Sequence, residues 1–165
     1  AAVAAAAASA VKEMRLRSDD AQALNAGACL LHRLAGEGPA ARDLVRAAGG
    51  LQAALEAVAS LPEDRELPVT AVAMALELHG LDLGRPGDQA QLLELLRPSA
   101  AAVRAALRLM HQGSWRQRGA GAGSLPPALL RRVLGVLLAH AEHEGVLVSG
   151  LAFLADACGA GPAGC

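Results

Sequence analysis

Aromatic residues are almost absent from this chain of 165 residues, which has one Phe, one Trp and no Tyr. Isoleucine is missing as well, so the 53% hydrophobic content is nearly all Ala, Leu and Val. Apolar surface must therefore be buried through small or unbranched side chains, and these residues favour helices. The composition predicts helices packed on helices with an ordered core, and it argues against disorder.

An excess of charge of one sign is also absent, since fifteen basic residues oppose sixteen acidic residues for a net charge of −1. Such a chain has no field that would attract nucleic acid or anionic lipid, so we expect neither as a partner. No stretch of 18 residues is free of charge, because His140–Glu144 and Asp156 interrupt the most apolar region. This pattern argues against a helix that crosses a membrane.

Cysteine is scarce, and the three present, Cys29, Cys158 and Cys165, have no metal-like spacing. An odd number of cysteines without such spacing favours a reducing, intracellular and most simply cytoplasmic location. The first residue is Ala, and residues 1–8 lack the basic segment of a signal peptide. We therefore expect the chain to be a piece of a larger protein.

Hydrophobic residues recur with the period of a helix throughout the chain. Leu51, Leu55 and Val58 follow the spacing i, i+4, i+7, and residues 103–110 and 130–138 repeat this spacing. Gly and Pro interrupt the pattern at regular intervals, so the predicted helices are short.

A shift of the sequence by 44 positions aligns one group of helices with the next. Apolar residues then coincide with apolar residues, and Asp20 coincides with Asp64. The aligned pairs are Val11/Leu55, Met14/Val58, Ala28/Val72, Leu30/Met74, Leu31/Ala75 and Leu34/Leu78. The same register recurs at Val103 and at Gly150-Leu151. Repetition with such a period is typical of stacked helical repeats.

The segment Ala41-Arg-Asp-Leu-Val-Arg-Ala-Ala-Gly-Gly-Leu51 resembles the armadillo repeat. In that family a short first helix ends at small residues before a second helix leaves at a steep angle. Gly49 and Gly50 are the candidate bend, because glycine has no Cβ and reaches positive φ. The resemblance implies an all-α, right-handed superhelical α-solenoid of armadillo-like repeats. We expect one array over residues 1–165, with units at 1–36, 37–80, 81–112 and 125–160 and a flexible loop at 113–124.

The resemblance also places a binding groove on the third helix of each repeat. Nuclear-import receptors of this family present Trp and Asn there, one turn apart. This chain instead has Cys29 with Arg33, Ala73 with Glu77, Arg104 with Arg108 and Ala152 with Asp156. A receptor for nuclear-localisation signals is therefore not expected. The predicted groove has mixed charge, and its candidate partner-binding residues are Arg33, Glu77, Arg104, Arg108 and Asp156.

No pattern in the sequence predicts catalysis, a cofactor or a metal. His140 and His143 are placed on one helix face but match neither zinc motif of the His-Glu-x-x-His type. The Gly-rich run 119–124 has no following Lys and is interpreted as a spacer. Cys29 is interpreted as a buried small hydrophobic residue rather than a nucleophile.

The predicted turns carry two further features. Trp115 lies in a predicted loop beside Arg116 and Arg118, and it is either a partner contact or the end of the preceding apolar stripe. The acidic turns 18–20 and 62–64 are interpreted as helix N-termini.

These observations predict a non-enzymatic protein-interaction scaffold. The alternative is a structural or regulatory segment of a larger protein. The resemblance to the armadillo family implies a kinase-like protein, a ubiquitin-ligase adaptor or a ciliary or cytoskeletal component as that protein, and with the last of these a ciliary or cytoskeletal location. Because neither end of the array has a polar cap, we expect further repeats, other domains or a protein partner to cover the ends.

Overall fold

The computed structural model describes residues 2–117 and 125–157, without the side chains of residues 114–117. All regular structure in these ranges is helical and none of the described residues lies in a strand, which confirms the all-α prediction. The helices form two compact units, Ala1–Leu81 (unit 1) and Asp82–Cys165 (unit 2).

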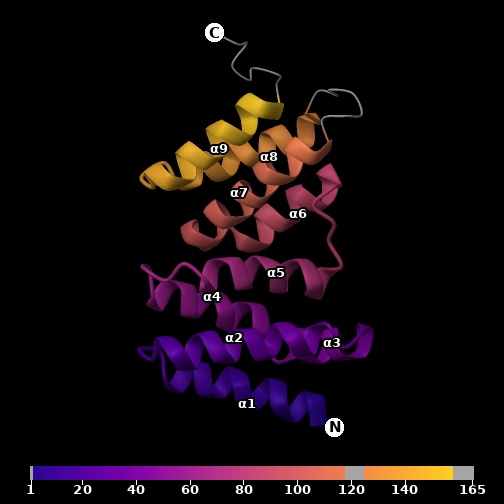
Figure 1. Ribbon diagram of the computed structural model, residues 1–165, viewed down its shortest axis with the longest axis vertical. Coiled ribbons are helices and arrows are strands. Elements are labelled where there is room, and N and C mark those ends of the chain that lie inside the picture. The colour runs from indigo at the N-terminus through magenta and orange to yellow at the C-terminus, as the bar shows by residue number, and fades with distance from the viewer. Residues whose placement is uncertain (1, 118–124, 158–165) are drawn as a thin grey trace. The chain divides into compact units, whose positions relative to one another are not determined.

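Unit 1 contains two pairs of helices with a short helix between them (Figure 1). The helices are α1 (Ala2–Leu16), α2 (Ala21–Ala35), α3 (Pro39–Ala47), α4 (Gly50–Ser60) and α5 (Leu67–His79). Helix α1 packs against α2, and α4 packs against α5. The pairs then stack in a fixed order, because α1 contacts α4 and α2 contacts α5. Helix α3 contacts both helices of the first pair.

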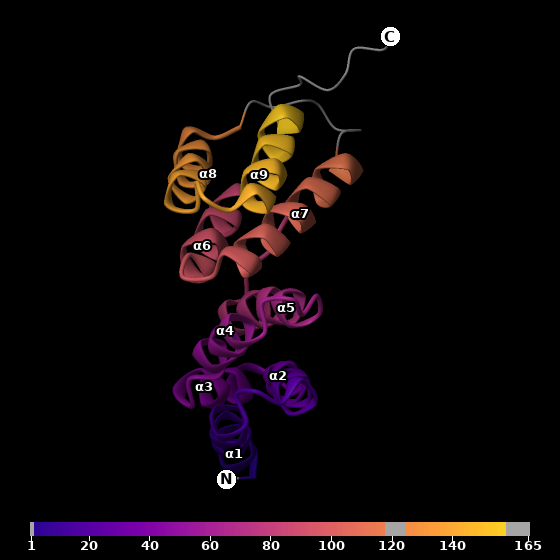
Figure 2. The same ribbon diagram turned by 90° about the vertical axis from the view of Figure 1, so that its left-hand side faces the viewer.

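Unit 2 repeats this scheme with two pairs of helices (Figure 2). Its described helices are α6 (Pro86–Leu96), α7 (Ala100–Gln117), α8 (Pro127–Ala139) and α9 (Glu144–Ala157). Helix α6 packs against α7 and α8 against α9, while α8 stacks on α6 and α9 stacks on α7. Stacking of first helix on first helix and second on second is therefore common to both units.

The 44-residue shift aligns buried positions of α2 with buried positions of α5. Ala28 and Leu31 have no exposed surface, and neither do their counterparts Val72 and Ala75. The alignment does not hold for Leu30, which is 43% exposed although its counterpart Met74 is buried. Three of the aligned pairs in these helices therefore occupy equivalent places in the core, and the fourth does not.

Each acidic turn holds the start of a helix, although only Asp20 stands at the N-cap position, since the N-cap residue of α5 is Glu66. The Asp20 carboxylate accepts a hydrogen bond of 3.0 Å from the Ala23 backbone N–H at the start of α2. The Asp64 carboxylate accepts one of 2.9 Å from the Leu67 N–H at the start of α5. Each aspartate thereby satisfies an amide that has no partner within its helix. The interpretation of these turns as helix N-termini is confirmed.

A glycine brings the two helices of a pair into close contact in each unit. A Cβ on Gly27 of α2 would lie 2.4 Å from Met14 Cγ of α1. A Cβ on Gly150 of α9 would lie 2.3 Å from Leu137 Cδ2 of α8. The sequence register aligns Gly27 with Gly150, so two equivalent helix pairs use the same close approach.

The bend between α3 and α4 depends on its two glycines for different reasons. Gly49 has φ of 77°, in the left-handed region that favours glycine. Gly50 has no positive φ, but a Cβ there would lie 2.7 Å from Val45 Cγ1 and 3.1 Å from the Val45 carbonyl oxygen. Gly49 therefore reverses the chain, and Gly50 lets α4 start close to the end of α3.

We expect Gly49→Ala to lower the free energy of unfolding of unit 1 by about 1–2 kcal/mol, the cost of a left-handed backbone for a residue with a Cβ. Gly49→Asn is the matched control, because Asn tolerates this conformation better than other residues. Urea unfolding followed by circular dichroism measures both variants. Equal destabilisation by Ala and Asn would contradict the assignment of the cost to backbone strain.

Candidate functional site

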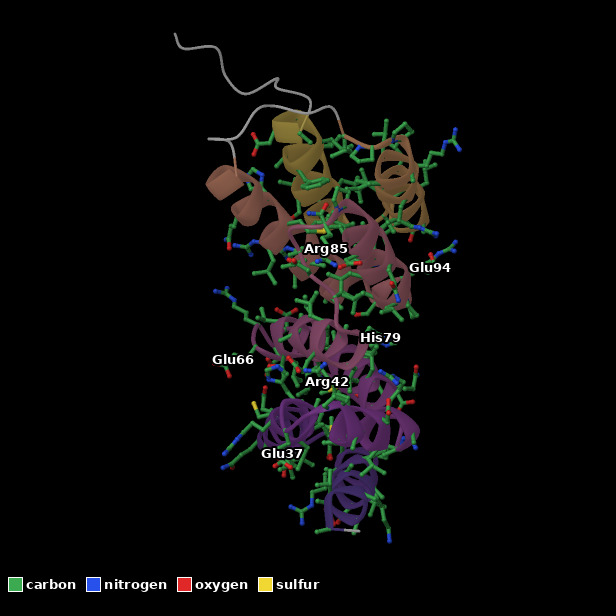
Figure 3. The ribbon with its side chains drawn as sticks, turned by 90° about the vertical axis from the view of Figure 1, so that its right-hand side faces the viewer. Glu37, Arg42, Glu66, His79, Arg85 and Glu94 are labelled. Carbon is green, nitrogen blue, oxygen red and sulfur yellow. The ribbon has the colours of Figure 1, made fainter. Side chains whose placement is uncertain are left out.

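Unit 1 contains two residues of the predicted groove, Arg33 and Glu77, and they differ in their exposure and in their contacts. Arg33 is exposed on α2. The Glu77 carboxylate on α5 forms an ion pair of 2.6 Å with Arg42 of α3, and about one third of each side chain is exposed. Arg42 is labelled among the helices of unit 1 in Figure 3. Glu77 is thus engaged by its own chain and links α3 to α5.

Unit 2 contributes Arg104, Arg108 and Asp156. Arg104 and Arg108 are exposed one turn apart on α7. The Asp156 side chain on α9 is only 8% exposed and pairs with His111 Nδ1 of α7 at 2.7 Å. This pair ties α9 to α7, so Asp156 does not offer a free carboxylate to a ligand.

The predicted mixed-charge groove stays a prediction, but the structure shows what its two acidic members contact. Glu77 forms an ion pair with Arg42, and Asp156 lies against His111, in each case between helices of one unit. The three arginines remain exposed, and in unit 2 Arg104 and Arg108 lie together on α7. The members that α7 itself contributes are therefore both basic.

Arg104 is positioned by a glycine of the neighbouring helix. A Cβ on Gly145, in the first turn of α9, would lie 3.0 Å from Arg104 Cδ, Nε and Nη1. The absence of that Cβ lets the arginine side chain lie along the N-terminus of α9. Arg104 is therefore a partly packed residue, whereas Arg108 has no such contact and is the better probe of the surface.

Trp115 does not lie in a loop. Helix α7 continues to Gln117, so the first five residues of the predicted loop 113–124 are helical. The contacts of the Trp115 side chain fall outside the described part of the structure, as do residues 118–124 and the Gly-rich run within them. The placement of Trp115 as a partner contact or as the end of an apolar stripe stays a prediction.

Two further interpretations of the sequence are wrong. Cys29 is exposed rather than buried, because α2 buries Leu24, Ala28 and Leu31 on the opposite side. His140 and His143 lie in the turn between α8 and α9, not on a helix face. Their ring centroids are 5.8 Å apart, and His140 Nε2 is 2.8 Å from the Arg97 carbonyl oxygen. The His140 contact joins the α8–α9 turn to the end of α6.

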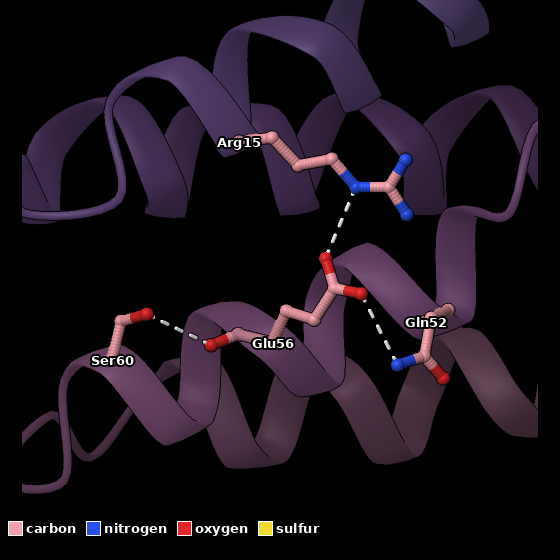
Figure 4. A network of polar contacts seen from close by, with 4 residues as sticks. All are labelled: Arg15, Gln52, Glu56 and Ser60. Carbon is pink, nitrogen blue, oxygen red and sulfur yellow. Dashed lines mark hydrogen bonds and ion pairs between the residues drawn. The ribbon is translucent and has the colours of Figure 1, made fainter.

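A shallow pocket of about 120 Å³ lies between α1, α2 and α4 in unit 1. Arg15 and Glu56 are among its lining residues, and Arg15 Nε donates a hydrogen bond of 3.1 Å to Glu56 (Figure 4). Gln52 donates to the same carboxylate at 3.2 Å, and the Ser60 hydroxyl donates to the Glu56 carbonyl at 3.0 Å. Since the two charges neutralise each other, the network links α1 to α4 rather than forming a charged binding site.

Hydrogen bonds and burial shift three titratable groups in unit 1. The Arg15 side chain lowers the pKa of Glu56 through its hydrogen bond. The Leu67 amide, assisted by the Asn25 side chain, lowers the pKa of Asp64 below its ordinary value of 3.8. Burial, assisted by the charge of Arg46, lowers the pKa of His79 below 6.5. His79 is therefore neutral at pH 7 and adds nothing to the basic surface.

Neither a three-ligand metal cluster nor a membrane-spanning helix occurs among the described residues. None of the groups of His, Cys, Asp and Glu in the described ranges brings together three side chains that could hold a metal ion. No helix within those ranges is long and apolar enough to cross a bilayer.

Comparison with protein-family models, curated proteins and solved structures gave no match to this chain. Support for the candidate binding surface therefore comes from the structure of this chain alone.

We expect Asp64→Ala to destabilise unit 1 by about 1 kcal/mol at pH 7, the usual effect of removing a helix cap. A carboxyl whose pKa is lowered by folding stabilises the fold above its ordinary pKa and loses this effect as the pH falls toward the lowered value. The difference between Asp64→Ala and the unaltered chain should therefore shrink below about pH 4. Thermal unfolding between pH 7 and pH 3 measures it.

Asp19→Ala is the matched control, because Asp19 is an exposed residue in the neighbouring acidic turn, where Asp20 is the cap of α2. Its effect on stability should be small at every pH. An Asp64→Ala effect that stays constant from pH 7 to pH 3 would show that the capping carboxylate is not its source.

Proposed function

We propose that this chain is a non-enzymatic protein-interaction scaffold built from armadillo-like helical repeats, stacked as a right-handed superhelical α-solenoid. One observation carries the proposal: in each unit the first helix of a pair packs on the first helix of the next pair, and the second helix packs on the second. Stacked repeats of this kind are a common basis for extended protein-binding surfaces.

The packing of each helix pair supports the repeat interpretation. Gly27 and Gly150 make the same close approach to the preceding helix in different units, and Asp20 and Asp64 each accept a hydrogen bond from a backbone N–H in the first turn of equivalent helices. A helix pair of this kind buries its apolar side only against the neighbouring pairs, so it has no closed core of its own. We therefore place the function on the surface that the stacked pairs leave exposed.

The exposed arginines of α7 indicate what kind of ligand this surface prefers. Arg104 and Arg108 lie one turn apart and are exposed, while the acidic Asp156 is held by His111. A guanidinium group recognises carboxylates with paired hydrogen bonds, so acidic segments of a protein suit this surface. We therefore propose an acidic protein segment as the ligand of unit 2.

A structural segment of a larger protein is the second candidate. The exposed leucines of α8 and α9 favour it, since Leu134, Leu138 and Leu151 are 44%, 79% and 60% exposed. Side chains of this size in such a cluster mark a surface that another protein element covers.

We expect Arg108→Glu to reduce binding of an acidic partner at least about 10-fold, because reversing one charge replaces attraction by repulsion at the contact. Proximity labelling of the expressed chain, followed by quantitative mass spectrometry, identifies candidate partners. Titration of the purified partner then gives the dissociation constants. Arg33→Glu, measured separately, tests whether unit 1 shares the ligand.

Arg85→Glu is the matched control, because Arg85 is an exposed arginine of unit 2 that lies before α6 rather than on α7. It changes the net charge equally. If Arg85→Glu and Arg108→Glu weaken binding equally, the effect comes from the net charge of the chain. That result would count against α7 as the binding surface.

A further inference from the structure

Ser18 lies in the exposed turn that joins α1 to α2 in unit 1. The turn covers residues 17–19, and all three are exposed. Arg15 and Arg17 lie three positions and one position before Ser18. No other serine or threonine in the sequence has an arginine three positions before it. The basic residues ahead of Ser18 therefore distinguish it from every other hydroxyl side chain of the Ser and Thr type in this chain.

Basic residues ahead of a serine are a pattern that some protein kinases recognise. Kinases select substrates partly by charge pattern, and a carboxylate in the kinase groove binds a guanidinium group with paired hydrogen bonds. Residues 15 and 16 belong to the last turn of α1. Because the ends of helices open at little cost in free energy, a kinase can bind residues 15–18 in an extended form without unfolding unit 1.

The structure also provides a group that can bind a phosphate on Ser18. Ser18 and Arg15 line the same pocket of about 120 Å³ between α1, α2 and α4. Arg15 bonds to Glu56 through Nε alone, and its two terminal nitrogens form no hydrogen bond or ion pair with any other described residue. Figure 4 shows both of these nitrogens without a contact to the residues drawn. Two neighbouring N–H donors of this kind match the oxygens of a phosphate.

A cation beside the phosphate is needed at this position. Asp19 and Asp20 directly follow Ser18, and their carboxylates repel a further negative charge. Arg15 offsets this repulsion, because it lines the pocket together with Ser18. Arg17 is not among the residues that line the pocket, and its Nε pairs with Glu13 at 3.2 Å. Arg15 is therefore the better placed of the two arginines.

We propose that Ser18 is a phosphorylation site for a protein kinase that selects an arginine three positions before serine, and that Arg15 binds the phosphate. In the reaction Ser18 Oγ bonds to the γ-phosphorus of ATP, the bond from this phosphorus to the β-phosphate oxygen breaks, and ADP leaves. The hydroxyl proton passes to a base of the kinase. The phosphate brings a charge of about −1.5 to −2 at pH 7 to the neutral Arg15–Glu56 pair. This proposal does not depend on the proposed binding surface of α7.

The first experiment tests the modification. The 165-residue chain is incubated with Mg²⁺, ATP and a purified kinase that requires an arginine three positions before serine, and mass spectrometry locates the phosphate. We expect Ser18→Ala to reduce the incorporation of phosphate at least about 10-fold. Ser60→Ala is the matched control, because Ser60 is exposed and lines the same pocket but follows Ala57, Val58 and Ala59. It should leave the incorporation unchanged.

Three results of this experiment would overturn the proposed site. The first is a chain that takes up no phosphate, and the second is an equal uptake by Ser18→Ala and the unaltered chain. The third is a faster modification of Ser18 by a purified kinase that selects acidic residues after serine, since that kinase would recognise Asp19 and Asp20 instead of Arg15. Circular dichroism checks that the variants keep their helices.

The second experiment tests the contact between the phosphate and Arg15. Phosphoserine is incorporated at position 18 during synthesis of the chain, so that no kinase is needed, and phosphorus-31 NMR follows the second ionisation of the phosphate. Arg15 stabilises the dianion. Arg15→Gln should therefore raise the pKa of this ionisation above its value in the phosphorylated chain with Arg15.

Arg17→Gln is the matched control for this contact. Arg17 is exposed and is closer to Ser18 in the sequence, but it pairs with Glu13 along α1. Its replacement removes the same charge and should raise the pKa of the phosphate less. Equal rises in the two variants would show that the effect comes from the general charge of the turn, and that result would overturn the assignment of Arg15.

Discussion

Close approach between paired helices is the constraint on which the structure depends. A chain with a single Phe and a single Trp has few side chains that can fill a wide gap between helices. It buries surface instead by bringing backbones together, as Gly27 does against Met14 and Gly150 against Leu137. Interiors are packed too densely to accept a further methyl at such points without movement. Glycine therefore lets the helices of these two pairs, α1 with α2 and α8 with α9, approach closely.

The sequence predicted the helices and their repetition better than it predicted the surface. The period of apolar residues indicated the buried positions of α2 and α5, because a residue that faces a core must be apolar whatever its neighbours are. Leu30 and Cys29 were misplaced, because apolar character alone does not say which side of a helix is covered. Helix α7 was predicted too short, since Gly113 and the residues after it were interpreted as a break although one glycine does not end a helix.

The candidate site shows why charge could not be predicted from register alone. Alignment of the repeats placed Glu77 and Asp156 at positions equivalent to those of Arg33 and Arg108. It could not show which side chains contact the two acids. Arg42 lies 35 positions before Glu77 and His111 lies 45 positions before Asp156, so both ion pairs depend on how helices pack. An acid held between two helices stabilises the unit and no longer defines the ligand. Only the tertiary structure shows that these two acids have partners within their own unit.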